Sequence, residues 1–389
     1  SGDFNTAVGR EALYSNTTAD SNTALGYSAM KLNTTGGANT AVGAYSLDSN
    51  TTGYSNTAIG CDAMQTNTEG FGNTATGENS LELNTTGDLN VAIGKSTLRS
   101  NTTANNNTAV GACALNANTT GTSNVAVGKD ALKTNITGNC NVAIGEGALE
   151  LNTGTSNTAV GRNALTANAA GNQNDAFGRH ALDANTSGDN NSAFGASALG
   201  ANTTADNNVA MGYFALGANT LGSNNVAIGV EALCGTIAGN NTAVGYRALK
   251  ENGATGYQNT AVGYLSLSCN TSGDGNSALG RESLEANTTG ANNTAVGYSS
   301  LTTNTTGGIN TAIGVNALKF NTTASNNTAI GFETLLCTTT GCQNTAVGRG
   351  AMELNTTGCS HVAIGHLALD SNTTGTFNTA VGKAAGTAI

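Results

Sequence analysis

Apolar and polar residues follow one another along the chain in a fixed order that repeats from one end to the other. Each unit reads N-T-A-V-G-x-x-A-L-x-x-N-T-T-G-x-x, and we number its positions from the first Asn, beginning at Asn5. The glycines at position 5 run from Gly9 to Gly382. Most of the intervals between them equal the length of this unit, and the few exceptions are shorter or longer by a single residue. Repetition of this kind predicts a stack of like structural units.

The period predicts an all-β fold, a parallel β-solenoid or β-roll of about 23 coils with 17 residues per coil. The unit is too short for two helices, and Gly, Asn and Thr favour turns and strands. We expect two strands of about five residues in each coil. Pro is absent, as expected where each strand residue pairs with a neighbouring coil. No change of composition divides the chain, so residues 1–389 should form one repetitive domain, a segment of a longer fibre.

Alternation along the second strand predicts which side chains point inward. Position 9 is Leu or Met in all 22 complete coils, so this column, from Leu13 to Leu369, should be the core. Position 11 is small or apolar, as at Leu83, and should also point inward, whereas the mostly polar position 10 should point outward. By the same alternation Asn at position 12 and Thr at position 14 should face solvent, and Thr at position 13 should face inward.

The first strand has two uniform columns. Position 3 is Ala in all 23 units, and position 4 is apolar in 22 of them, with Thr76 as the exception. These neighbours face opposite sides, and a column facing solvent would be expected to contain polar residues somewhere in the series. We therefore expect one face to pack inside the coil and the other against another chain. The alternative is a thin coil whose Ala/Gly face is hidden by its own turns.

The phrase Asn-Thr-Ala-Val-Gly-x-x-Ala resembles the head repeats of trimeric autotransporter adhesins, which are of the type N-S-x-A-I-G-x-x-A. It also looks like the repetitive shafts of phage and bacterial tail-fibre-like proteins. The resemblance covers residues 39–43 and their equivalents in every coil, but not the Asn-Thr-Thr-Gly half of the unit, as at residues 33–36. It implies a left-handed parallel β-roll with three chains in one spike.

Position 12 is Asn in 20 of 22 coils, and many of these residues begin an N-x-Ser/Thr sequon. If they face outward in a secreted protein, they are candidate glycosylation sites. The alternative is a ladder of stacked amides that bond from coil to coil. The candidates are Asn16, Asn33, Asn50, Asn84, Asn101, Asn118, Asn135, Asn185, Asn202, Asn270, Asn287, Asn304, Asn321, Asn355 and Asn372. Five more sequons, at Asn106, Asn190, Asn240, Asn292 and Asn326, stand just before a unit.

The remaining chemistry of the sequence is sparse. Catalysis needs a local, non-repeating cluster of reactive residues, and none is recognisable, so we expect no enzyme, no catalytic residue and no cofactor. The three histidines are His180, His361 and His366. We expect the last two to be solvated surface residues and not metal ligands. The calcium-binding repeat of β-rolls is missing, and no phosphate-binding loop occurs.

Eight cysteines are present, and only Cys342 and Cys359 share a repeat position in consecutive coils. Stacked residues about 4.8 Å apart are within disulfide range, so this pair is a candidate disulfide. Two free thiols in a turn are the alternative. A bridge would indicate an oxidising compartment.

Charge and hydropathy limit the partners. With 14 Lys+Arg against 24 Asp+Glu, the chain lacks the basic surface that nucleic acid requires. No apolar run is long enough to cross a membrane. We expect a homo-oligomer, with a trimer favoured by the resemblance, or an end-to-end filament with covalent glycans as a further partner.

Taken together, these features predict a structural extracellular fibre shaft at a cell or virion surface, with an adhesive role. A phage or viral tail-fibre shaft and an ice-binding solenoid are the alternatives. Against ice binding, Thr17 and Thr18 are adjacent, so they should face opposite ways.

Overall fold

The computed structural model describes residues 2–253 and 255–387 and consists of short parallel strands and turns, without a helix among these residues. It divides into two compact units, Ser1–Asn191 and Ser192–Ile389. The strands of the first unit are β1 (Thr6–Val8), β2 (Thr23–Leu25), β3 (Thr40–Val42), β4 (Thr57–Ile59), β5 (Thr74–Thr76), β6 (Val91–Ile93), β7 (Thr108–Val110), β8 (Val125–Val127), β9 (Val142–Ile144), β10 (Thr158–Val160) and β11 (Asp175–Phe177). The strands of the second unit are β12 (Ser192–Phe194), β13 (Val209–Met211), β14 (Val226–Ile228), β15 (Thr242–Val244), β16 (Thr260–Val262), β17 (Ser277–Leu279), β18 (Thr294–Val296), β19 (Thr311–Ile313), β20 (Thr328–Ile330), β21 (Thr345–Val347), β22 (Val362–Ile364) and β23 (Thr379–Val381).

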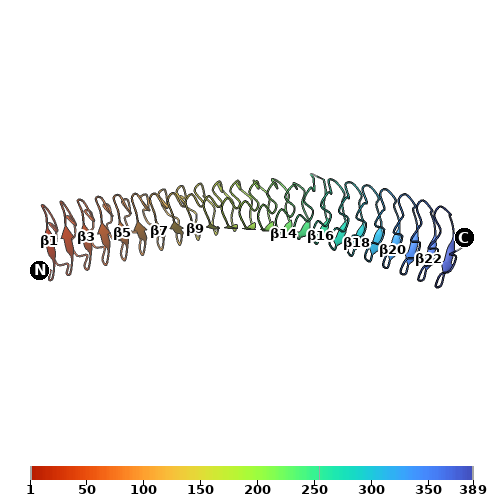
Figure 1. The fold of residues 1–389 in the computed structure, drawn as a ribbon. Coiled ribbons are helices and arrows are strands. Elements are labelled where there is room, and N and C mark those ends of the chain that lie inside the picture. Colours follow the sequence, from red (N-terminus) through yellow and green to blue (C-terminus); the bar gives the residue numbers. More distant parts are fainter. Residues whose placement is uncertain (1, 254, 388–389) are drawn as a thin grey trace. The chain divides into compact units, whose positions relative to one another are not determined.

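Within each unit, strands that are one repeat apart in the sequence pair in parallel (Figure 1). The register matches equivalent residues, so that Ala41 lies opposite Ala58 and Val42 lies opposite Ile59. Each coil of the structure therefore corresponds to one repeat of the sequence. The predicted parallel β-solenoid is confirmed.

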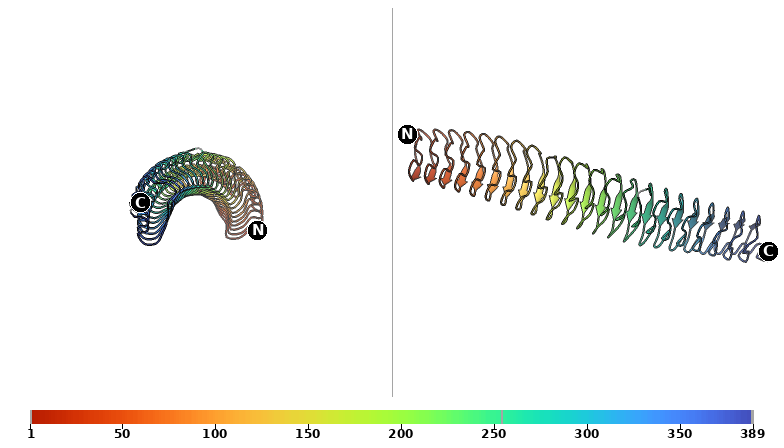
Figure 2. Two further views of the ribbon diagram at one scale, coloured as in Figure 1. Left: turned by 90° about the vertical axis from the view of Figure 1, so that its right-hand side faces the viewer. Right: turned by 90° about the horizontal axis from the view of Figure 1, so that it is seen from above.

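Each coil contains one strand of three residues, not two strands of five (Figure 2, right). The prediction of a second strand is wrong because residues at positions 7 and 9 adopt positive φ, which an extended strand does not allow. At position 9 the Leu and Met residues all have φ between 49 and 54°. The residue at position 17, directly before the next coil, also has positive φ.

Main-chain hydrogen bonds connect the coils through the turns as well as the strands. Tyr45 N–H donates to Tyr27 O of the preceding coil at 2.9 Å, and Leu47 N–H donates to Ala63 O of the following coil at 3.0 Å. Further round the same coil, Thr51 N–H donates to the following coil. This regular use of turn N–H groups compensates for the unfavourable left-handed residues and explains why Pro is absent from the turns too.

The core is thin and consists mainly of Ala and Leu. Position 3 Ala, position 8 Ala, Ser or Thr, and position 9 Leu or Met are buried in the inner coils of both units. The prediction for position 9 is right, although Leu13 in the first coil is partly exposed. The prediction that position 11 points inward is wrong, since Leu83 and Leu354 are 40% and 47% exposed. Strand alternation does not apply to positions 7–11, because this segment is a turn.

Glycine is required at position 5. Its φ lies between 128 and 145° throughout, and a Cβ at Gly111 would lie 2.6 Å from Gly128 O of the next coil. Neighbouring backbones therefore come too close for any side chain.

We expect Gly111→Ala to destabilise its coil strongly, since both the φ and the backbone contact are incompatible with Cβ. Gly37→Ala is the control. It stands at position 16, where Asp20, Tyr54 and Phe71 occur naturally. Hydrogen exchange should accelerate around Gly111 and not around Gly37. Equal protection in the two variants would contradict this account.

Candidate interaction surface and internal asparagine ladders

The outward face of the strands is an apolar strip. The central Ala of each inner strand is buried, and the last residue points to the opposite side because adjacent strand residues alternate. Ile59, Ile93 and Ile144 are each 41% exposed there. We call the last residues of strands β1 to β23 the outer strip. The structure thus places the Ala column inside and the Val/Ile column outside.

The outer strip carries no charge. The first residue of each strand shares its face and is Thr, Val or Ser, except at Asp175. An uncharged column of mostly β-branched side chains loses little on desolvation, so this face is suited to contact with another apolar surface.

Exposed aromatic residues lie two positions beyond the outer strip, at position 6. The Tyr246 and Tyr264 rings stack with centroids 5.5 Å apart and planes 13° apart. In the following coil the Arg281 guanidinium carbon lies 5.6 Å from the ring centroids of both Tyr264 and Tyr298. Aromatic and Arg side chains that stack from coil to coil thus order the surface beside the strip.

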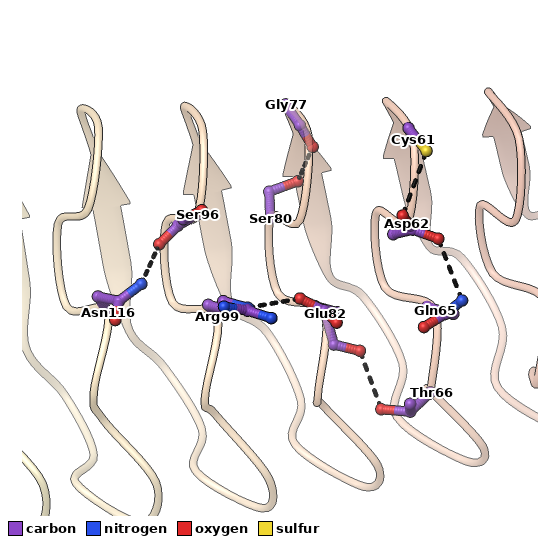
Figure 3. Close-up of polar contacts among 10 residues, drawn as sticks. All are labelled: Cys61, Asp62, Gln65, Thr66, Gly77, Ser80, Glu82, Ser96, Arg99 and Asn116. Atoms are coloured by element: carbon purple, nitrogen blue, oxygen red, sulfur yellow. Dashed lines mark hydrogen bonds and ion pairs between the residues drawn. The ribbon is translucent and has the colours of Figure 1, made fainter.

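Most of the charged residues lie in the turn after each strand. Figure 3 shows a coil-to-coil contact in which Arg99 Nε donates to Glu82 Oε2 at 2.6 Å. This hydrogen bond raises the pKa of the Arg99 guanidinium. In the coil before Glu82, Gln65 and Cys61 both donate to the Asp62 carboxylate. Exposed pairs of this kind contribute about 0–1 kcal/mol each, so they set the surface charge more than the stability.

The Asn column at position 12 is buried. Asn50 Nδ2 donates to Asn33 Oδ1 of the preceding coil at 2.7 Å and to Gly53 O of its own coil at 2.9 Å, and Asn67 repeats both bonds. The prediction that this column points outward is wrong, because the alternation on which it rested stops at the left-handed turn. Of the fifteen sequon residues, only Asn16 is partly exposed. The buried ones are Asn33, Asn50, Asn84, Asn101, Asn118, Asn135, Asn185, Asn202, Asn270, Asn287, Asn304, Asn321, Asn355 and Asn372.

A sugar on this column would disrupt the ladder. The amide nitrogen that would carry it already donates both of its hydrogens inside the coil, as in Asn50. The amide ladder, which the sequence left as the alternative, is therefore the arrangement in this fold.

A second buried Asn column lies at position 1. Asn56 Oδ1 accepts the Asn73 backbone N–H at 2.9 Å, and Asn56 Nδ2 crosses the coil to Gly70 O at 2.8 Å. The Gly70 carbonyl also accepts Asn67 Nδ2 at 3.0 Å, so both columns meet at position 15. We did not predict this column. Its signal in the sequence was the same near-invariance that marked the Leu column.

Thr replaces Asn at position 12 in two coils, at Thr236 and Thr338, and the second replacement leaves a buried acceptor unsatisfied. Asn321 Oδ1 is buried and has no hydrogen-bond partner among the described residues, because Thr338 lacks the amide that would donate to it.

We therefore expect Thr338→Asn to stabilise the protein by about 1–2 kcal/mol, the value of satisfying a buried acceptor. Thermal unfolding and local hydrogen exchange would measure it. Thr302→Asn is the control, because Thr302 lies outside the columns, and it should change little. A destabilised Thr338→Asn variant would contradict the ladder geometry.

His361 is buried, so its assignment to the solvated surface is wrong. It replaces Asn at position 1 and reproduces its bonds: Nδ1 accepts the Asn378 N–H at 3.1 Å, and Nε2 lies 2.6 Å from Gly375 O. The backbone N–H makes Nδ1 an acceptor, and the side-chain nitrogen Nδ2 of Asn372 also lies 3.1 Å from Nε2. His180 lies 3.1 Å from Asp183 at the surface, and His366 is partly exposed.

The two predicted disulfide residues lie together. Cys342 Sγ is 3.0 Å from Cys359 Sγ, and both side chains are partly exposed. They are free thiols in this structure. Cys234 is buried, and this burial raises the pKa of its thiol.

Within residues 2–253 and 255–387, no group of three His, Cys, Asp or Glu side chains could hold a metal ion. No helix in this part of the chain is long and apolar enough to cross a membrane. No family model matches the chain, and no curated protein matches it.

Proposed function

We propose that the chain is the structural, non-enzymatic shaft of an extracellular fibre, at a cell or virion surface, that assembles with copies of itself. The observation that carries this proposal is the outer strip, an uncharged apolar face present on strand after strand. A monomer would leave this face in water, and contiguous exposed apolar surface marks an interaction site. The resemblance to autotransporter heads favours three chains, and a tail-fibre shaft would use the same surface.

We expect the purified chain to have a mass in solution that is a multiple of 38.4 kDa. Replacing Ile93, Val110 and Val127 together by Lys should dissociate it, since three charges would then be buried in the interface. Light scattering would give the mass of each form, and electron microscopy would reveal a filament or a spike.

The control is Ile93→Thr, because Thr76 already occupies the outer strip in β5. It should leave the assembly intact. A folded, monodisperse monomer of the unaltered chain would refute assembly through this strip.

We propose that any glycans are attached at position 17 and not at position 12. The five sequons at position 17, Asn106, Asn190, Asn240, Asn292 and Asn326, have exposed side chains on turns. An Asn on an exposed turn is accessible to a glycosylating enzyme, whereas the ladder column is not.

In a glycosylating host we expect sugars at some of these five residues and none on the buried column. Site mapping by mass spectrometry before and after deglycosylation tests this. Occupied Asn84 or Asn101 would contradict the ladder, and an intact mass of 38.4 kDa would exclude glycans altogether.

Ice binding is a second candidate that one observation favours. The first residue is Thr in 14 of the 23 strands, and it lies on the same face as the outer strip, in register from coil to coil. Against it, Phe177 and Met211 interrupt the flat face. Absence of thermal hysteresis in a solution of the chain would eliminate this function.

A further inference from the structure

Side chains at position 16 turn back toward the preceding coil. Asp88 Oδ1 accepts the Phe71 N–H at 2.9 Å, and Asn139 Oδ1 accepts the Thr122 N–H at 2.7 Å. Each donor itself stands at position 16 of the coil before. This column therefore brings equivalent residues of successive coils into direct contact.

Cys342 and Cys359 occupy this position in consecutive coils. Cys359 Sγ takes the place of the usual oxygen acceptor and lies 3.0 Å from the Cys342 backbone N. The same orientation brings the two sulfurs to 3.0 Å. The side-chain direction that brings Cys359 Sγ to the Cys342 N–H therefore also points it at Cys342 Sγ. Both residues are partly exposed, so a small oxidant can reach them.

We propose that Cys342 and Cys359 form a disulfide that fastens one coil to the next. The oxidant is a low-molecular-weight disulfide such as glutathione disulfide. The Cys359 thiolate attacks it, forms a mixed disulfide and releases one glutathione thiolate. The Cys342 thiolate then attacks the Cys359 sulfur, closes the protein disulfide and releases the second glutathione thiolate. Two protein thiols are oxidised, the glutathione disulfide is reduced by two electrons, and two protons are released.

The order of attack follows from the contacts. Cys359 Sγ accepts the Cys342 N–H, which holds the Cys359 sulfur beside Cys342. The hydrogen bond to Cys359 raises the pKa of the Cys342 thiol, so Cys342 stays protonated longer.

The bridge would close a ring of one repeat and limit separation of residues 327–343 from residues 344–360. A solenoid opens by separation of neighbouring coils, since each coil contacts only those beside it. A covalent bond across one such junction would therefore act locally. It would slow exchange of the turn N–H groups on both sides, and thiol reductants would reverse the effect.

The test uses the full chain, first reduced and then equilibrated with glutathione disulfide before alkylation and digestion with trypsin. We expect six of the eight cysteines to be alkylated. The peptides 320–349 and 350–383 should be joined, because trypsin cleaves after Lys319, Arg349 and Lys383. Hydrogen exchange in residues 327–360 should slow on oxidation and recover on reduction.

Three variants make the result specific. Cys342→Ser should give no joined peptide and no redox effect on exchange, because a mixed disulfide at Cys359 then has no neighbouring thiol to resolve it. It should still fold, since Ser223 and Ser325 fill position 16 naturally and accept the same N–H at 3.0 Å. Cys359→Ser should behave likewise, whereas Cys337→Ser should keep the bridge although Cys337 lies in the same tryptic peptide.

Alkylation of all eight cysteines after oxidation would overturn the proposal, as would a bridge through Cys337 or one between chains. These outcomes are independent of assembly. A chain that fails to associate through the outer strip can still form this disulfide.

Discussion

Leu115→Asp is expected to open the solenoid locally and to lower its stability by roughly 4–7 kcal/mol, the combined cost of lost packing and a buried charge. Leu115 is fully buried, and its N–H donates to Ala131 O of the next coil at 2.9 Å. No side chain in the column offers a carboxylate a partner, because its neighbours are Leu98 and Leu132.

Leu115→Met is the matched control, because Met30, Met64 and Met352 occupy the same column naturally. It should cost less than about 1.5 kcal/mol. Hydrogen exchange would localise the effect to the coils around residue 115, which matters because repetitive chains need not unfold in two states. Unchanged protection in Leu115→Asp would mean that this column is not the core.

The solenoid could be predicted because the same sequence unit repeats along the whole chain. A short and regular period, Leu or Met at position 9 and Ala at position 3 leave parallel coils as the simplest way to bury the same residues again and again. The strand at position 3 was also interpretable, since true strand alternation separates the buried Ala58 from the exposed Ile59.

The second half of the coil could not be predicted by the same method. Nothing in the propensity of Leu suggests the left-handed φ found at Leu47, which an isolated Leu avoids. That conformation is imposed by hydrogen bonds to neighbouring coils and therefore exists only in the stack. Once alternation fails at position 7, every orientation inferred beyond it is unsupported, which explains the errors at Leu83 and at Asn50.

The polar interior was the larger omission. Asn is usually exposed, and we did not predict from the sequence that the uniform Asn at position 1 would be buried. In the structure this Asn forms hydrogen bonds within its coil and to the neighbouring coils. The Asn56 side-chain amide donates to Gly70 O, and the Asn56 backbone N–H donates to Asn39 Oδ1. Near-invariance of a polar residue in every coil was the available signal, because a solvent-facing column would tolerate more substitutions.

Asn67→Asp is the sharpest test of the amide ladder at position 12. Asn67 Nδ2 donates to Asn50 Oδ1 at 2.8 Å and to Gly70 O at 3.0 Å, and Asn67 Oδ1 accepts Asn84 Nδ2 at 2.8 Å. An Asp carboxylate would keep the acceptor but would face two oxygens without a hydrogen to donate. We expect a loss of roughly 3–5 kcal/mol near neutral pH, the cost of a buried, unpaired charge.

The pH dependence distinguishes this charge effect from simple loss of packing. Burial should raise the pKa of the introduced carboxyl in the folded state above its unfolded value of about 3.9. The destabilisation is then complete above the folded pKa and shrinks as the pH falls through it, because a protonated Asp can donate one bond again. Asn67→Thr is the control, since Thr236 and Thr338 stand in this column, and its smaller loss should not vary with pH. Chemical denaturation across acid and neutral pH would measure both. A loss of stability equal for Asp and Thr at every pH would mean that Asn67 fills space and that the amide ladder contributes nothing of its own.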